Sequence, residues 1–340
     1  MFKSKREELE YEIKRVFTDE RVAYCRYQVY EENGLKVIAF VDSEGAKEKL
    51  LQFFNNFSSQ VEARVTVLGN ELPEKLQYGQ VRTSVMDVRK DPRFRSERVR
   101  QLIFGEWVRV LEIGTDFSLI KDLNHGYIGY IRNQEMAFCS QARMHAICSK
   151  PLYKVGSRFA LVNSLEDVNS SLWVPLGAYI YTEDLQEPVF ESGNGNYEIT
   201  EGHLSLAKNS QEVFEKNIRF FMGTPYLWGA STTFGTDCSG LVGRLYNLAG
   251  TIIPRDSDQQ ERSLQEISAD ERRFGDLIYF PGHVGMYLGA DLMLHSNIYH
   301  GGVSVDNVFS PVEAYGRELL TKITSIRRVE GGVTFENDHR

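Results

Sequence analysis

Two stretches near the C-terminal end decide the fold: residues 223–242, GTPYLWGASTTFGTDCSGLV, and residues 275–296, GDLIYFPGHVGMYLGADLMLHS. In the first stretch, apolar residues recur at helical spacing after Asp237, which is a good helix N-cap. The helix is expected to run until Gly250, so that Cys238 lies in its first turn. There the unpaired N–H groups and the positive end of the helix dipole favour a thiolate, a lowered thiol pKa and a site for an oxyanion.

The second stretch predicts three short strands, over residues 276–280, 283–288 and 292–296. A three-residue turn that pairs residue 288 with residue 292 would make His283 and His295 diagonal neighbours on one face of the sheet. A cysteine nucleophile needs one histidine as a base and a second polar group that orients it. The two stretches together therefore predict a Cys–His–His site. His300 is a rival third member, although its surroundings read as a loop.

The chain upstream of these stretches falls into segments that differ in the secondary structure their residue patterns predict. Residues 1–78 predict the order helix, two strands, helix, strand, with a helix over 4–17 and a second helix capped by Ser43. Residues 79–190 predict short strands between turns, among them 108–113 and 127–131. Residues 186–200 contain Pro and Gly-Asn-Gly-Asn and are expected to form a linker, after which residues 210–222 predict an amphipathic helix.

Composition narrows the class of protein. The 340 residues carry a formal net charge of −8, 42% are hydrophobic and the pI is near 5.5, so we expect no nucleic-acid groove. Four cysteines without zinc-ligand spacing predict no structural metal and suit a reducing compartment. The N-terminal residues lack an apolar signal core, and no stretch predicts a membrane span. We therefore expect a cytoplasmic protein, or an exported one if a leader has been removed.

Several ordered motifs resemble those of the NlpC-type peptidoglycan cysteine endopeptidases. They are GTPYLWG at 223–229, FGTDCSGLV at 234–242, IPRDS at 253–257, GDL at 275–277 and HVGMYLG at 283–289. Upstream, residues 79–190 resemble tandem bacterial SH3-like domains. The first of the two carries SERVRQLIFGE at 96–106 and HGYIGYI at 125–131, with Tyr130 in place of the usual Trp. Ala230 departs from the family, which usually has a second Gly after Trp-Gly.

The resemblance implies an α+β chain with a papain-like catalytic domain, in which a helix packs on an antiparallel sheet. The resemblance also implies that two SH3-like β-barrels and a small α/β N-terminal module precede the catalytic domain in the chain. The expected boundaries are 1–78 for the module, 79–138 and 139–190 for the SH3-like domains, and 204–329 for the peptidase domain.

Residue by residue, the resemblance implies Cys238 as nucleophile, His283 as base, His295 as the group that orients it, and Tyr226 as a phenol beside the oxyanion. The expected substrate-binding residues are Glu97, Tyr127, Asp237, Ser239, Arg255, Asp256 and Ser257. Blander interpretations stay open: Asp237 as an N-cap only, Arg255 as a loop salt bridge and Glu97 as a solvated carboxylate. No metal and no cofactor are expected.

The resembling subgroup cleaves the bond between γ-D-glutamate and a diamino acid in murein peptides with a free N-terminal L-alanine. We therefore expect a monomeric cysteine endopeptidase whose partner is a murein tripeptide or tetrapeptide, acting in the recycling of peptidoglycan fragments. Glu97 and Tyr127 stand at the motif positions that meet the substrate amine. Two alternatives remain: a non-catalytic wall-peptide-binding protein, and a related thiol amidase or acyltransferase.

Overall fold

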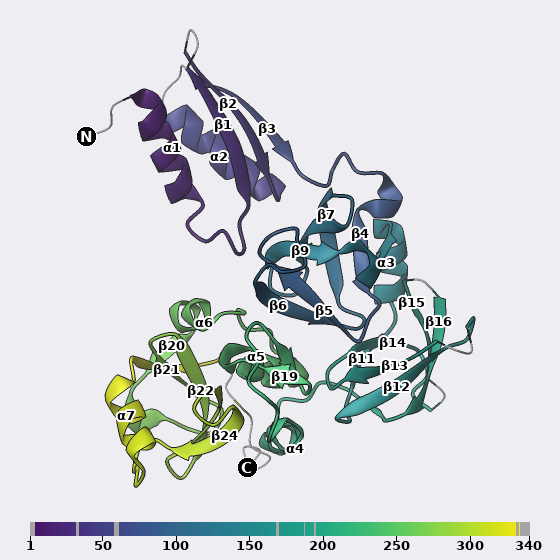
Figure 1. Ribbon diagram of the computed structural model, residues 1–340, viewed down its shortest axis with the longest axis vertical. Helices are drawn as coiled ribbons and strands as arrows, with labels where there is room; N and C mark the ends of the chain where they lie inside the picture. Colours follow the sequence, from purple (N-terminus) through teal and green to yellow (C-terminus); the bar gives the residue numbers. More distant parts are fainter. Residues whose placement is uncertain are drawn as a thin grey trace, which may run out of the picture. The chain divides into compact units, whose positions relative to one another are not determined.

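The computed structural model describes residues 4–31, 34–57, 61–167, 170–186, 188–193, 195–330 and 333 (Figure 1). The chain forms two compact units. The first comprises Met1–Gln80, Arg89–Ser96 and Trp107–Met144, and the second comprises Val81–Val88, Glu97–Glu106 and His145–Arg340.

The first unit begins with a helix-covered sheet. Its elements are α1 (Lys5–Val16), β1 (Cys25–Glu31), β2 (Leu35–Val41), α2 (Glu44–Phe57) and β3 (Val61–Val67). The central strand β2 pairs antiparallel with β1 and parallel with β3. Both helices lie on the same face of the sheet (Figure 1), where Leu9 and Ile13 of α1 and Leu50 and Phe54 of α2 join one apolar core. The expected order helix, two strands, helix, strand is confirmed.

The rest of the first unit is built from short antiparallel strands. They are β4 (Tyr78–Val81), β7 (Trp107–Ile113), β8 (Phe117–Asp122), β9 (Ile128–Arg132) and β10 (Met136–Cys139), adjacent in the order β10-β4-β7-β8-β9. The short helices η1 (Glu74–Leu76), η2 (Asn133–Glu135) and α3 (Gln141–Cys148) connect or follow them. The Asp122 carboxylate accepts the N–H groups of Asn124, His125 and Tyr127 and so fixes the turn between β8 and β9. The expected strands at 108–113 and 127–131 are confirmed to within one residue.

The second unit starts with a set of short strands. They are β5 (Val85–Arg89), β6 (Arg98–Ile103), β11 (Leu152–Val155), β12 (Phe159–Ser164), β13 (Ser171–Pro175), β14 (Tyr179–Tyr181), β15 (Val189–Ser192), β16 (Gly195–Glu201) and β17 (Leu204–Ser205). Strands β14-β11-β17 form one sheet and β13-β12-β16-β15 another. A common apolar core includes Val155, Val162 and Ile180.

The linker expected at residues 186–200 is wrong. Apart from residues 187 and 194, which lie outside the described residues, this segment contains the paired strands β15 and β16. Phe190 is 3% exposed, and its ring stacks on Tyr197 with centroids 5.8 Å apart. The buried Phe190 and the partly buried Tyr197 supply the apolar burial that a linker lacks, and glycines at a turn suit a hairpin as well as a linker.

The C-terminal part of the second unit packs helices on an antiparallel sheet. The helices are α4 (Gln211–Phe221), α5 (Cys238–Leu248), α6 (Ser257–Ser263), η3 (Ala269–Glu271) and α7 (Ala314–Lys322). The strands of the sheet are β20 (Gln265–Ile267), β21 (Leu277–Phe280), β22 (His283–Gly289), β23 (Leu292–Asn297), β24 (Gly302–Asn307) and β25 (Ser325–Arg328). They are adjacent in the order β20-β25-β21-β22-β23-β24. A separate small hairpin consists of β18 (Ser231–Thr232) and β19 (Gly235–Thr236). The α+β class with a helix on an antiparallel sheet is confirmed.

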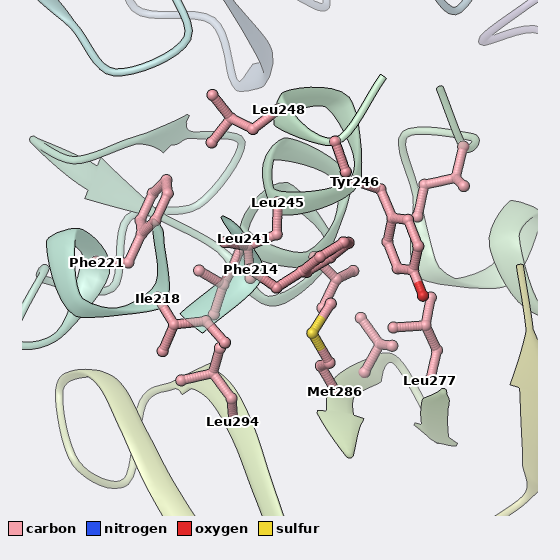
Figure 2. Packing of buried hydrophobic residues seen from close by; sticks show 14 of the residues in the cluster. Phe214, Ile218, Phe221, Leu241, Leu245, Tyr246, Leu248, Leu277, Met286 and Leu294 are labelled. Atoms are coloured by element: carbon pink, nitrogen blue, oxygen red, sulfur yellow. The ribbon is translucent and has the colours of Figure 1, made fainter. Parts of the chain in front are cut away.

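Helix α5 lies at the centre of the largest apolar core of this part (Figure 2). Phe214 and Ile218 of α4 reach toward it from one side, and Met286 and Leu294 of the sheet lie beneath. Burial of such side chains contributes about 1.5–3 kcal/mol each. The position of the helix, and of its first residue Cys238, is therefore set by packing along its whole length.

The turn between β22 and β23 differs from the expected one. Ala290 and Asp291 both have positive φ, 48° and 64°, which is typical of a two-residue hairpin turn. Gly289 pairs with Leu292, and the ladder is irregular at Leu288, so the expected pairing of 288 with 292 is wrong. Beyond the irregularity, Met286 pairs with Leu294 and Tyr287 with Met293, which is the expected register.

Candidate active site

Cys238 is the first residue of α5, and only 7% of it is exposed. Asp237 precedes it with an extended backbone, and its Oδ1 accepts the Gly240 N–H at 2.6 Å. The expected N-cap is thus confirmed. An N-cap of this kind satisfies one of the unpaired N–H groups of the first turn and fixes where the helix starts.

The Asp237 carboxylate forms a buried bidentate pair with Arg255. The guanidinium Nη2 lies 2.7 Å from Oδ2 and Nη1 lies 3.1 Å from Oδ1, while Nη1 also donates to Ser239 Oγ at 2.8 Å. Oδ2 accepts the Gly229 N–H as well, at 2.9 Å. One carboxylate therefore ties together the helix start, the preceding loop and the segment before α6. Asp237 and Arg255 are 6% and 5% exposed, so the ion pair is almost completely removed from solvent.

The loop that leads to Cys238 passes close to the start of β6. Gly229 has φ of 74°, and a Cβ there would lie 2.6 Å from the Arg98 carbonyl oxygen, so this position requires glycine. The Trp228 Nε1–H donates to Glu97 Oε1 at 3.0 Å. Glu97 is thus brought beside the loop that leads to Cys238. Ala230 is fully buried and is not among the positive-φ residues, so its backbone does not need the family's glycine.

His283 and His295 meet directly. His283 Nε2 lies 2.8 Å from His295 Nδ1, and the ring centroids are 5.1 Å apart. The expectation that these histidines share one face of the sheet is confirmed. His295 is fully buried, whereas His283 is partly exposed at the end of its strand.

Sequence reasoning missed Asp306. His295 Nε2 lies 2.7 Å from Asp306 Oδ2, and the rival residue His300 contacts the other oxygen through Nε2 at 3.1 Å. His295 pairs with Ser304 across β23 and β24, so residue 306 is its diagonal neighbour. The sequence feature that could have revealed Asp306 is its position in GVSVDN, residues 302–307. This segment alternates apolar and polar residues, as a strand does, and follows the strand of His295 along the chain.

Burial favours the neutral forms of Cys238 and His283. Burial, followed by the neighbouring Asp237 charge, raises the pKa of the Cys238 thiol to about 12, although the N–H groups of Val284 and Ser239 act in the opposite direction. Burial, followed by the neighbouring His295, lowers the pKa of His283 to about 3. The lowered thiol pKa expected from the helix dipole alone is therefore wrong, because desolvation outweighs the first-turn N–H groups.

Tyr226 lies on a strand-like segment beside the residues that lead to Cys238. Its backbone bridges to Thr236, two residues before Cys238, and its N–H donates to the Gly301 carbonyl at 2.9 Å. Burial first, and then the nearby Cys238 and Asp237, raise the pKa of the phenol to about 12. A phenol with this pKa stays protonated near neutral pH and can donate a hydrogen bond.

The remaining expected residues lie in different surroundings. Asp256 is the N-cap of α6 in a capping box with Gln259, and Ser257 is the first residue of that helix. Tyr127 belongs to the first unit, where it is 4% exposed and its N–H donates to Asp122.

The C-terminal end of α5 is held by charged side chains. Lys154 donates to the carbonyl and the Oδ1 of Asn247, and Arg244 donates to Glu106 Oε1 at 3.3 Å. A cation at a helix C-terminus is favourable because the free carbonyls carry partial negative charge. The helix that carries Cys238 is therefore fixed by polar contacts at both ends.

Among the residues that the structure describes, no group of three or more His, Cys, Asp or Glu side chains is arranged to hold a metal ion. Within that same part, no helix combines the length and apolar character needed to cross a membrane.

Two segments of the chain match known protein families. Residues 223–317 match the NlpC/P60 family, and residues 88–135 match the bacterial dipeptidyl-peptidase SH3 domain. Dipeptidyl-peptidase 6 of Lysinibacillus sphaericus is 29% identical over 255 residues, which are 69% of this chain and 93% of that protein. The gamma-D-glutamyl-L-lysine dipeptidyl-peptidase of Bacillus subtilis (strain 168) is 37% identical over 124 residues, 34% of this chain and 41% of that protein.

A solved structure of an NlpC/P60 family protein from Bacillus cereus ATCC 10987 has the same fold. Its TM-score is 0.64 at 19% identity, and the match covers 74% of this chain and 99% of the other. The resemblance seen in the motifs is confirmed. The chain is a cysteine peptidase that carries an NlpC/P60 domain preceded by a bacterial dipeptidyl-peptidase SH3 domain.

Proposed function

We propose that this cell-wall peptidase hydrolyses the bond between γ-D-glutamate and a diamino acid in murein peptides whose N-terminal L-alanine is free. One observation carries the chemistry. Cys238 stands at a helix start and contacts the backbone N–H of Val284. His283 directly precedes Val284 in the sequence and is hydrogen-bonded to His295. A thiol, an adjacent imidazole and an orienting group are the parts that nucleophilic acyl transfer needs.

The reaction proceeds in two steps. Because Nε2 of His283 bonds to His295, its Nδ1 takes the Cys238 proton as the sulfur attacks the γ-carbonyl carbon. Transfer accompanies attack, since a thiol pKa of about 12 and an imidazole pKa of about 3 keep both groups neutral beforehand. The C–N bond breaks, the leaving nitrogen receives the proton, and a thioester remains. Water then gives a proton to His283 and attacks the thioester carbon. The C–S bond breaks and His283 returns this proton to the sulfur, which releases the γ-carboxyl group and restores the thiol.

Tyr226 and the first-turn N–H groups of α5 are the donors that we propose for the oxyanion. A donor aimed at developing negative charge in a desolvated site lowers the barrier by about 3–4 kcal/mol. The phenol qualifies because its pKa of about 12 keeps its proton in place. We propose Ser239, Arg255, Asp237, Asp256 and Ser257 as residues that shape the groove.

Glu97 supports the proposed specificity for a free amine. One carboxylate oxygen accepts the Trp228 Nε1–H, and the second is the acceptor that we propose for the N-terminal ammonium. An acylated N-terminus would leave this carboxylate without a cation, which disfavours blocked or internal peptides. The names of the relatives, which are dipeptidyl-peptidases, support cleavage two residues from a free end. We propose that the chain acts in the cytoplasm on released fragments, whose N-termini are free.

The test uses a defined tripeptide, L-Ala-γ-D-Glu-L-Lys, with a free or an acetylated N-terminus. The wild-type chain should release L-Ala-γ-D-Glu from the free form only. Glu97→Gln keeps an acceptor for Trp228 but removes the charge, so KM for the free form should rise about tenfold while the acetylated form gains relative to it. An unchanged preference in Glu97→Gln would remove this residue from amine recognition. Cys238→Ala should give no product, and undiminished turnover would refute the mechanism.

A further inference from the structure

Asp306 lies at the end of a chain of partly buried hydrogen bonds that starts at the proposed base. His295 is 0% exposed and stands between His283 Nε2, 2.8 Å from its Nδ1, and Asp306 Oδ2, 2.7 Å from its Nε2. The Asp306 side chain is itself 9% exposed. Because the His295 ring between them is fully buried, these two short contacts constrain which of its nitrogens carries a hydrogen.

Asp306 is held as a carboxylate. Burial alone would raise its pKa, but the hydrogen bonds from His295 and His300 outweigh burial and the net pKa is lowered. Its Oδ2 also accepts from the Ser304 hydroxyl at 3.2 Å. An ionised carboxylate can only accept hydrogen bonds, so every neighbour must present a hydrogen to it.

This requirement fixes both imidazoles. His295 must carry its proton on Nε2, which points to Asp306, and in the neutral ring Nδ1 is then bare. A bare Nδ1 accepts, so His283 must carry its proton on Nε2 and has a bare Nδ1. That nitrogen is the one needed to take a proton from the thiol.

A neighbouring amide favours the opposite arrangement. Asn297 Nδ2 lies 3.0 Å from His295 Nε2, while its Oδ1 accepts the His300 N–H, which sets the orientation of the amide. An amide N–H directed at Nε2 would require that nitrogen to be bare. The carboxylate is closer and charged, and Asn297 Nδ2 has Ser304 Oγ at 2.9 Å as another acceptor. Asp306 therefore decides the tautomer, and its loss would leave Asn297 to reverse it.

We propose that Asp306 is a positioning residue that sets the tautomers of His295 and His283 and so makes His283 Nδ1 the base. This inference deepens the proposed function and rests on Cys238 and His283 as the reacting pair. Asp306 touches neither the thiol nor the substrate. It acts through His295 only.

The test is Asp306→Asn in the full chain, with Asp291→Asn as the matched control. Asp291 lies in the turn between β22 and β23, where Arg272 and Ser310 hold its carboxylate, away from the reacting groups. Nitrogen-15 NMR of histidine-labelled protein reports which ring nitrogen carries hydrogen. The wild type and Asp291→Asn should show a bare His283 Nδ1, and Asp306→Asn should show that nitrogen protonated.

Turnover gives the second readout. In Asp306→Asn, kcat on the free tripeptide should fall about 10²–10⁴-fold with KM nearly unchanged, and Asp306→Glu should recover part of the loss. A wild-type His283 that carries its proton on Nδ1 would overturn the proposal even if Asp306→Asn did not fold. Unchanged tautomers in a folded Asp306→Asn would overturn it as well. The NMR readout needs no substrate, so a wild type that fails to cleave the tripeptide refutes the proposed function separately.

Discussion

Replacement of Arg255 by Met tests whether the contacts around the helix start hold the site together. The guanidinium is 5% exposed and bonds to both oxygens of Asp237, at 2.7 and 3.1 Å, and to Ser239 Oγ. Met has a similar length but cannot donate. Arg255→Met therefore leaves a buried carboxylate without its cation, directly before Cys238.

The size of the effect follows from burial. Removal of one partner of a buried pair costs about 3–5 kcal/mol of unfolding free energy. Asp237 keeps its backbone donors at Gly229 and Gly240, so we expect a value near the lower limit, about 3 kcal/mol. The matched control is Arg262→Met, since Arg262 is 66% exposed and pairs with Asp258 across one helical turn. That loss should be about 0.3–0.5 kcal/mol.

Urea unfolding of the full chain, followed by tryptophan fluorescence, measures both variants. The midpoint of the transition that includes the C-terminal unit should move to much lower urea in Arg255→Met and hardly at all in Arg262→Met. Added salt should reduce the small loss of unfolding free energy in Arg262→Met, whose ion pair is exposed, and leave the large loss in Arg255→Met unchanged. A loss in Arg255→Met below about 1 kcal/mol, together with a raised KM, would refute this reasoning and favour a direct role in substrate binding.

Three further predictions concern protonation. Because the thiol pKa is about 12, alkylation of Cys238 by iodoacetamide should accelerate about tenfold per pH unit across the neutral range, and a plateau near pH 7 would contradict this. His283 has a pKa of about 3 when folded and 6.5 when unfolded, so the unfolded chain binds more protons between these values. The free energy of unfolding should therefore fall as the pH drops from 6.5 to 3. Urea titrations should show a smaller fall over this interval in His283→Gln than in the wild type. Tyr226→Phe should lower kcat about 10–1,000-fold with little change in KM, measured on the free tripeptide; an unchanged kcat would exclude the phenol as an oxyanion donor.

Features that depend on local sequence could be predicted. The helix start at Cys238 follows from the capping preference of Asp237 and from the apolar spacing behind it, and both act within one or two helical turns. The meeting of His283 and His295 follows from strand alternation across a short turn. This prediction was correct although the predicted turn was wrong. The irregularity at Leu288 offsets the change in turn length, so that Met286 and Tyr287 still pair with Leu294 and Met293.

Features that depend on tertiary burial could not be predicted. The helix dipole argued for a low thiol pKa at Cys238, but the packing of α5 on the sheet desolvates the thiol, and this is visible only in three dimensions. Asp306 was missed because its role needs the register of a third strand, β24, against β23. The strands at 189–201 were missed because Phe190 and Tyr197 are too few to show an alternating pattern, yet they are packed together in the fold.

The most direct test of the account is mass spectrometry of the products that the purified chain releases from L-Ala-γ-D-Glu-L-Lys and from its N-acetylated form. The account predicts L-Ala-γ-D-Glu and free lysine from the first peptide, a thioester of L-Ala-γ-D-Glu on the peptide that contains Cys238 in rapidly quenched samples, and almost no product from the acetylated form. Equal cleavage of both peptides would contradict the amine recognition assigned to Glu97. Cleavage at another bond, or none in a chain whose Cys238 is intact, would contradict the central claim.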